Sequence, residues 1–190
     1  MVKEFKKQIS FLDKEQINML EIIKKRRSCR KYDARPVEDE KINEVVQAGL
    51  LAPSAINRQS GSIIVIKDKA TRDALMEIKK KFAPPRGENF DPFYGAPVIL
   101  LVIAKKWPLA IHDGAAMMEN MLLEATNQGL GTCWVHCDDN QSECKEFKEF
   151  LSSFGLNPDE YVGVGHVLLG YSLMDGYPEK TINEGRVFVK

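Results

Sequence analysis

Residues 97–104 (PVILLVIA) and 109–128 (LAIHDGAAMMENMLLEATNQ) decide the fold of this chain. The first stretch is apolar throughout and bounded by turn residues, which is typical of a strand buried on both faces of a sheet. The second is long, mostly apolar and followed by Gly129 and Gly131, and it predicts a helix within the core. We therefore expect a central strand and a core helix, around which the other elements pack.

Shorter elements surround this pair. Apolar spacing and turn residues predict further helices at 13–26, from about 37 to before Pro53, at 70–82 and at 141–154. They predict strands at 62–67, 132–136 and 162–169, a strand-like piece at 186–190, and a candidate lid or substrate loop at 83–95. Helices outweigh strands in a mixed order, so we expect an α+β fold, and the length of 190 residues favours one domain over 1–190.

Composition limits the classes of partner. Lys plus Arg and Asp plus Glu number 27 each, so no overall positive field attracts nucleic acid or an anionic membrane. The opening MVKEFKK lacks a following apolar stretch, and the longest apolar run, 96–104, is too short to cross a bilayer. Four cysteines in a chain of this length indicate reduced thiols rather than a disulfide framework. We therefore expect a cytoplasmic protein.

The run RRSCR at residues 26–30 predicts a phosphate site. It places three guanidinium groups and one hydroxyl where a helix gives way to an extended segment. A guanidinium group remains charged at physiological pH, and its planar fork donates two parallel hydrogen bonds to phosphate. The alternative is that these cations only complement the dipole at a helix C-terminus.

Two further motifs are compatible with a planar ligand. APSAINRQ at residues 52–59 carries amides that match the edge of a flavin or purine, although an ordinary helix-to-strand turn uses the same residue types. GLGTCWV at residues 129–135 contains glycines that let a ligand approach the backbone, although a helix cap followed by a core tryptophan explains it equally well. The conjunction of the three motifs is more informative than any one of them.

In this order the motifs resemble those of the nitroreductase family of FMN-dependent oxidoreductases, from about residue 20 to residue 188. The matching features are RRSxR, APSxxNxQ, APV before the buried strand, Asp113-Gly-Ala-Ala, Gly-Leu-Gly and a C-terminal arginine. The resemblance implies a mixed, mainly antiparallel central sheet flanked by helices, in a homodimer that exchanges its C-terminal arms. The residues alone point the same way, because the apolar 187–189 follow a polar arm and need a sheet edge, such as a partner's.

The resemblance also implies cofactor-binding roles. The FMN phosphate and ribityl chain would be held by Arg26, Arg27, Ser28 and Arg30, with Arg186 completing the clamp. The other subunit would reach the same flavin with Pro53, Ser54, Ala55, Asn57 and Gln59. The isoalloxazine would lie beside Cys133, Trp134 and Val135. No catalytic acid or base and no metal site is implied. The chain departs from the family pattern after Gln59, where Ser60-Gly61 replaces the usual proline and aromatic residue, and this leaves the substrate class open.

The implied activity is hydride transfer from NADH or NADPH through FMN to a small acceptor, such as a nitroaromatic or a quinone, in a ping-pong reaction. One alternative is a flavin-binding sensor or carrier without turnover. Another gathers Cys133, His136, Cys137 and Cys144 into a metal or redox site. Cys133 and Cys137 lack the usual two-residue gap, which disfavours that site.

Overall fold

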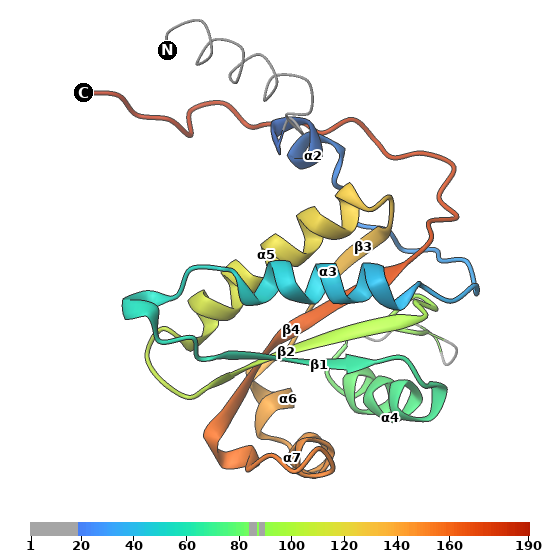
Figure 1. Ribbon diagram of the computed structural model, residues 1–190, viewed down its shortest axis with the longest axis vertical. Helices are drawn as coiled ribbons and strands as arrows, with labels where there is room; N and C mark the ends of the chain where they lie inside the picture. The colour runs from blue at the N-terminus through green and yellow to red at the C-terminus, as the bar shows by residue number, and fades with distance from the viewer. Residues whose placement is uncertain (1–18, 84–86, 88–89) are drawn as a thin grey trace, which may run out of the picture.

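The computed structural model describes residues 19–83, 87 and 90–190. It contains a four-stranded sheet in the order β1-β2-β4-β3, shown in Figure 1. The strands span Gly61–Ile66 (β1), Val98–Lys105 (β2), Gly131–His136 (β3) and Tyr161–Gly170 (β4), and their pairings are antiparallel. β2 lies between two other strands, and every residue from Val98 to Ala104 is buried. The predicted central strand and the α+β class are confirmed.

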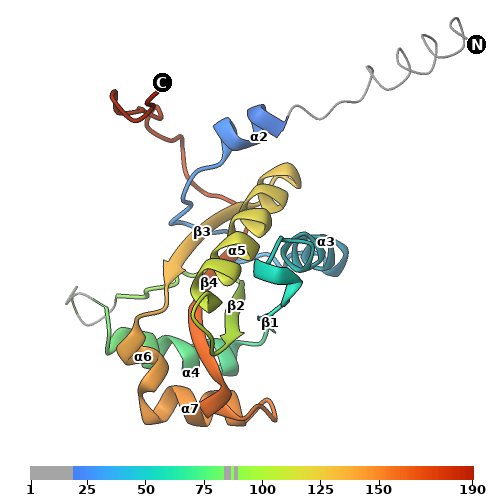
Figure 2. The ribbon, with the colours of Figure 1, turned by 90° about the vertical axis from the view of Figure 1, so that its left-hand side faces the viewer.

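Helices cover both faces of this sheet. α3 (Asp39–Leu50) and α5 (Ala110–Asn127) pack on one face, while α4 (Lys69–Lys80), α6 (Asp139–Glu143) and α7 (Lys145–Ser152) pack on the other (Figures 1 and 2). Each face has its own apolar cluster, built around Met118 and Met121 on the α5 side and around Leu75 and Phe147 on the α4 side. The long apolar stretch at 109–128 is thus a core helix, as predicted.

α5 lies close against the sheet because residue 114 has no side chain. A Cβ atom on Gly114 would come within 2.5 Å of the Val164 Cγ2 atom. Val164 is the extra residue at an irregularity where the β2–β4 register shifts between Val102 and Ile103. This close contact fixes the height of α5 over the sheet, and candidate site residues lie next to both ends of α5.

The sheet is extended by the segment that follows α2 (Met19–Lys25). Ser28 forms a parallel bridge with Thr132, and Tyr32 forms an antiparallel bridge with Ser172. The four named strands all pair antiparallel, which confirms the mainly antiparallel sheet, and the Ser28–Thr132 contact is an isolated parallel bridge beside β3. Two short 3-10 helices, η1 (Ala55–Asn57) and η2 (Pro158–Glu160), complete the elements.

Several expected boundaries change. The helix expected at 141–154 is two helices, because Cys144 is extended (φ −70, ψ 150) and its Sγ accepts the Phe147 N–H at 3.4 Å, which caps α7. Residues 13–18 of the first expected helix and part of the expected lid, 84–86 and 88–89, lie outside the described residues. The strand expected at 186–190 is wrong for the single chain: no strand forms there, and Phe188 is 92% exposed. No helix in the described part of the chain has the length and apolarity needed to span a bilayer.

Candidate functional site

The predicted phosphate-binding residues form an extended segment beside the start of β3, which we call the arginine segment (residues 26–30). The Cys29 N–H donates to the Thr132 carbonyl at 2.8 Å, and the Cys29 thiol donates to the Lys31 carbonyl at 3.2 Å. Cys29 is fully buried, whereas Ser28 is half-buried and Arg30 is exposed. The buried cysteine therefore anchors the segment against β3 and leaves its polar neighbours available.

The arginines of this segment have few anionic partners. Arg26 Nε lies 3.9 Å from Glu119 Oε1, at the outer limit of an ion pair. Arg27 Nη1 donates to the carbonyls of Lys24 and Arg26, the latter at 2.9 Å, while Arg27 Nε is buried without a hydrogen-bond partner. The Arg30 guanidinium lies 6.0 Å from the centre of the Tyr94 ring. A buried donor without a partner is costly, and an oxyanion would satisfy it.

A further cation, Lys180, lies against the arginine segment. Lys180 Nζ donates to the Ile23 carbonyl at 2.9 Å. Its pKa is lowered by burial and then by the nearby charges of Arg26 and Arg27. Three cations are therefore close together. Arg186, which the resemblance implied, is exposed on the C-terminal arm. Lys180 was missed, and its only sequence signal is that it is the sole basic residue between Tyr171 and Gly185.

The predicted residues of β3 do not share one side of the strand. Cys133 is buried and belongs to the α4-side core, against which Val135 packs, whereas Trp134 is 37% exposed on the opposite face. Their side chains cannot all meet one face of a planar ligand, so β3 can offer such a ligand only some of them together with its backbone. Burial raises the pKa of the Cys133 thiol, against the opposing influence of Arg30 and Ser28. Cys133 thus lies beside the arginine segment as a protonated, unreactive thiol.

The residues predicted to come from a second subunit lie at the far end of α5. We call residues 53–60 the amide loop; the Ala55 N–H donates to Asp113 Oδ1 at 3.0 Å, in the first turn of α5. The other end of α5 is followed by β3 (Figure 1), and Thr132 of β3 pairs with Ser28 of the arginine segment. Eighteen residues of helix span about 27 Å. One chain therefore brings the arginine segment and β3 together and keeps the amide loop apart from both.

The amide loop has an unusual backbone. Three of its residues are left-handed, with φ angles of 51° at Ile56, 54° at Asn57 and 50° at Gln59. Non-glycine residues seldom adopt this region. The Gln59 N–H donates to Ser54 Oγ at 2.9 Å, and Gln59 Nε2 donates to Asn57 Oδ1 at 3.0 Å. Beside the loop is a pocket of about 260 Å³, lined by Leu50, Ala52, Pro53, Ser54, Gln59, Gly61, Asp113 and Met117.

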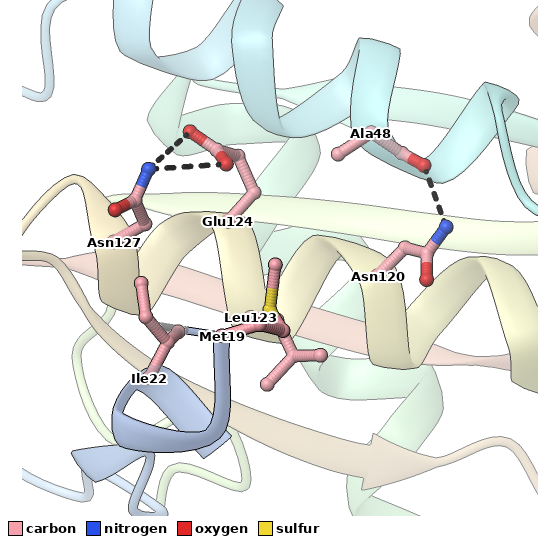
Figure 3. Close-up of a pocket in the computed structure, with 7 residues that line it drawn as sticks. All are labelled: Met19, Ile22, Ala48, Asn120, Leu123, Glu124 and Asn127. Atoms are coloured by element: carbon pink, nitrogen blue, oxygen red, sulfur yellow. Dashed lines mark hydrogen bonds between the residues drawn. The ribbon is translucent and has the colours of Figure 1, made fainter. Parts of the chain in front are cut away.

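A second pocket, of about 310 Å³, lies between α2, α3 and α5 (Figure 3). Its polar groups bond to one another: Asn120 Nδ2 donates to the Ala48 carbonyl at 3.1 Å, and Asn127 Nδ2 lies 3.4 Å from both Glu124 oxygens. None of the predicted cofactor-binding residues lines it; its walls are formed by Met19, Ile22, Ala48, Asn120, Leu123, Glu124 and Asn127. An apolar pocket whose one charged residue is acidic does not suit phosphate.

The cysteines do not assemble into the alternative metal or redox site. Burial raises the pKa of Cys137 to about 11, and its Sγ lies 3.7 Å from Ser142 Oγ. Cys144 caps α7 instead. In the ranges that the structure describes, no three His, Cys, Asp or Glu side chains are grouped so that they could hold a metal ion. Cys133, His136, Cys137 and Cys144 therefore do not form a metal-binding group in the described part of the chain.

The Nitroreductase family model matches residues 23–171, which include the arginine segment, the amide loop and the whole sheet. This chain belongs to the nitroreductase family. A relative from Archaeoglobus fulgidus, provisionally named NADH dehydrogenase/NAD(P)H nitroreductase, is 33% identical over 156 residues, covering 80% of this chain and 84% of the relative.

Solved structures agree with this nitroreductase fold. A nitroreductase with bound FMN from Bacteroides fragilis superposes with a TM-score of 0.83 at 28% identity, covering 91% of this chain and 98% of that chain. An FMN-dependent nitroreductase from Clostridium difficile gives a TM-score of 0.74 at 29% identity, covering 90% and 98%. The predicted sheet, with helices on both faces, is therefore the nitroreductase arrangement, and the resemblance seen in the motifs is confirmed.

Proposed function

We propose that this nitroreductase binds FMN and uses NADH or NADPH to reduce a small acceptor, such as a nitroaromatic or a quinone. The observation that carries the proposal is the buried, unpaired Nε of Arg27, beside Arg26 and Lys180, at the start of β3. These three cations repel one another, and Glu119, 3.9 Å from Arg26 Nε, carries a single negative charge among them. A phosphate monoester supplies the charge and the acceptor oxygens that these donors lack.

The donor set fits the phosphate of FMN. Arg26, Arg27 and Arg30 would hold its oxygens, Ser28 would add a neutral donor, and Lys180 would close the site from the C-terminal arm. The arginine segment keeps its place without a ligand, because Cys29 is buried and hydrogen-bonded to Thr132. A clamp that is already formed loses little conformational entropy when its ligand binds.

The chain's residues around the ring would bind and exclude water rather than exchange protons. Burial raises the pKa of the Cys133 thiol, so this residue would not exchange protons with the ring, and the half-buried Val135 would add an apolar contact. Bound FMN would supply the hydride chemistry, taking hydride from the nicotinamide and passing electrons to the second substrate in a ping-pong cycle. We assign no acid or base residue.

A homodimer would complete the site. The amide loop is separated from the arginine segment by the length of α5, so Pro53, Ser54, Ala55, Asn57 and Gln59 would reach the flavin held by the partner. The C-terminal arm supports this assembly. Val187, Phe188 and Val189 are 82%, 92% and 92% exposed, and burial against a second copy would remove these apolar side chains from water.

The test begins with the absorbance spectrum of the purified protein and with titration of the apoprotein with FMN and riboflavin. We expect a yellow protein that prefers FMN, because riboflavin lacks the phosphate. Stopped-flow mixing with NADH and with NADPH should then bleach the flavin band. A protein that binds FMN but is not bleached by either donor is a sensor or carrier. A colourless protein with no affinity for FMN contradicts the proposal.

A further inference from the structure

The amide loop holds a backbone shape that its own residues disfavour. Ile56 is β-branched and has a φ of 51, where its Cβ crowds the backbone. Its side chain is 86% exposed, so packing does not offset this cost within the chain. Asn57 and Gln59 are also left-handed. Hydrogen bonds within the loop, such as the one from the Gln59 N–H to Ser54 Oγ at 2.9 Å, stabilise part of this shape, and contacts from outside the loop add to them.

Asp113 contacts the loop on both sides of the strained residues. Its Oδ1 accepts the Ala55 N–H at 3.0 Å, and its Oδ2 accepts the Ser60 hydroxyl at 2.8 Å. The Ser60 Oγ in turn accepts the Trp107 Nε1–H at 3.0 Å. Asp113 is 5% exposed, so its carboxylate is removed from water and depends on these donors.

Three neighbouring features support the contact between Asp113 and the amide loop. Asp113 lies in the first turn of α5, where the helix dipole favours a negative charge. The Arg58 guanidinium lies 4.9 Å from the centre of the Trp107 ring, so Arg58 of the loop contacts the residue that donates to Ser60. Ser60 is the position at which the chain departs from the proline of the family pattern, so a proline there could not donate this hydrogen bond.

We propose that Asp113, acting through Ser60 and Ala55, is a positioning residue that holds the amide loop in the strained shape required to receive the partner's flavin. The inference rests on the proposed function, since it concerns the same flavin. Backbone strain persists where the surrounding structure enforces it, and it concentrates at ligand sites. The pocket beside the loop, lined by Ser54, Gln59 and Asp113, is where that strain and the loop's amides meet.

The experiment measures flavin affinity in full-length variants. Asp113→Asn keeps an acceptor for the Ala55 N–H but weakens the charged hydrogen bonds, and Ser60→Ala removes one of them. We expect each variant to lose affinity for FMN and for riboflavin by equal factors. For Asp113→Asn this factor should be about tenfold. The factor is shared because the predicted flavin contacts of the loop, Pro53, Ser54, Ala55, Asn57 and Gln59, carry no positive charge. Fluorescence titration of the apoprotein gives both affinities, and urea unfolding gives the stability of each variant.

Rescue separates positioning from loss of stability. Ile56→Gly removes the strain at a residue that is not a predicted flavin contact, because glycine adopts a positive φ at little cost. Added to Asp113→Asn, it should restore most of the lost flavin affinity. Ser142→Ala is the matched control: it removes a buried hydroxyl on the opposite face of the sheet, which accepts the Gly163 N–H at 3.0 Å. It should lower stability and leave flavin affinity unchanged.

The outcomes separate this inference from the proposed function. Wild-type protein that fails to bind FMN contradicts the proposed function. Wild-type binding with unchanged affinity in both Asp113→Asn and Ser60→Ala overturns the role of Asp113. A loss that Ile56→Gly does not restore, or that Ser142→Ala reproduces, overturns it as well. If Asp113→Asn does not fold, Ser60→Ala with and without Ile56→Gly provides the same test.

Discussion

The arginine segment and the amide loop lie at opposite ends of α5 and differ in what they lack. In the arginine segment no residue has a left-handed backbone, and one buried donor, Arg27 Nε, has no hydrogen-bond partner. In the amide loop the hydrogen bonds are satisfied and the backbone is strained, with Ile56, Asn57 and Gln59 left-handed. One region offers charge, and the other offers shape.

The arginine segment and the amide loop would therefore contribute to flavin binding in different ways, the first by charge and the second by precisely placed hydrogen bonds. Attraction between opposite charges acts over several ångströms and tolerates small errors of position. Hydrogen bonds to a flavin edge require donors and acceptors to be placed within a few tenths of an ångström. We therefore expect the arginine segment to supply most of the affinity for FMN over riboflavin, and the amide loop to act alike on both ligands.

The largest effect should come from removing the arm that would join the two regions across a dimer. Truncation after Met174 retains the Tyr32–Ser172 bridge and the hydrogen bond from the Leu173 N–H to the Lys31 carbonyl at 2.9 Å. We expect loss of the dimer and of flavin binding, measured by light scattering and fluorescence titration. A folded, truncated monomer that still binds FMN tightly would show that one chain holds a complete site.

Next in size is the loss of one guanidinium group from the clamp. Arg26→Ala or Arg30→Ala should weaken FMN binding by about 1.5 to 3 kcal/mol, the scale of a hydrogen bond to a charged group. Riboflavin binding should change little. Arg35→Ala is the control, because that guanidinium lies 3.3 Å from the centre of the Tyr171 ring, away from the segment. Equal losses for FMN and riboflavin would contradict the assignment of charge to this region.

Lowering the pH should destabilise the folded protein, because His166 is buried in β4 of the central sheet. Burial lowers the pKa of His166 to about 3, and its Nδ1 lies 3.1 Å from the Val135 carbonyl. In the unfolded chain the pKa is about 6.5, so the unfolded state binds the extra proton between these values and the free energy of unfolding falls as pH decreases. Between pH 6.5 and pH 5 the contribution of His166 is at most about 2 kcal/mol.

Urea unfolding at several pH values measures this dependence. His166→Gln removes the titrating group and should flatten the curve over that pH range, and His112→Gln, at an exposed position on α5, serves as the control. The same slope in wild type and His166→Gln would show that another group governs acid stability.

The smallest effect concerns which cation of the C-terminal arm, Lys180 or Arg186, would contact the FMN phosphate. Lys180→Ala should weaken FMN binding a few-fold, since Lys180 lies near Arg26 and Arg27, whereas Arg186→Ala should have less effect within one protomer. Isothermal titration of both variants measures the difference. The reverse order would mean that the arm takes a different path in the dimer and brings Arg186 to the phosphate, as the family resemblance implied.

Much of this protein was predictable from local sequence patterns. β2 and α5 were identified because the pattern of apolar residues reports burial directly, and the boundaries of β1, β3 and β4 fell within one residue of prediction. The phosphate-binding candidates were visible because Arg26, Arg27, Ser28 and Arg30 fall within five consecutive residues. The break at Cys144 was missed, because a cysteine that caps a helix with its thiol is not distinguishable by periodicity from one within a helix.

The sequence by itself determined the α+β class, the central strand, the core helix and the run of arginines, since each depends on neighbouring residues. Only the tertiary structure decided that the arginine segment pairs with β3, that the amide loop lies at the other end of α5, and that Lys180 joins Arg26. These facts depend on contacts between distant residues. The hydrogen bond from Ala55 to Asp113 joins residues 58 positions apart, and it lies beside a left-handed backbone that the intrinsic preference of Ile56 opposes.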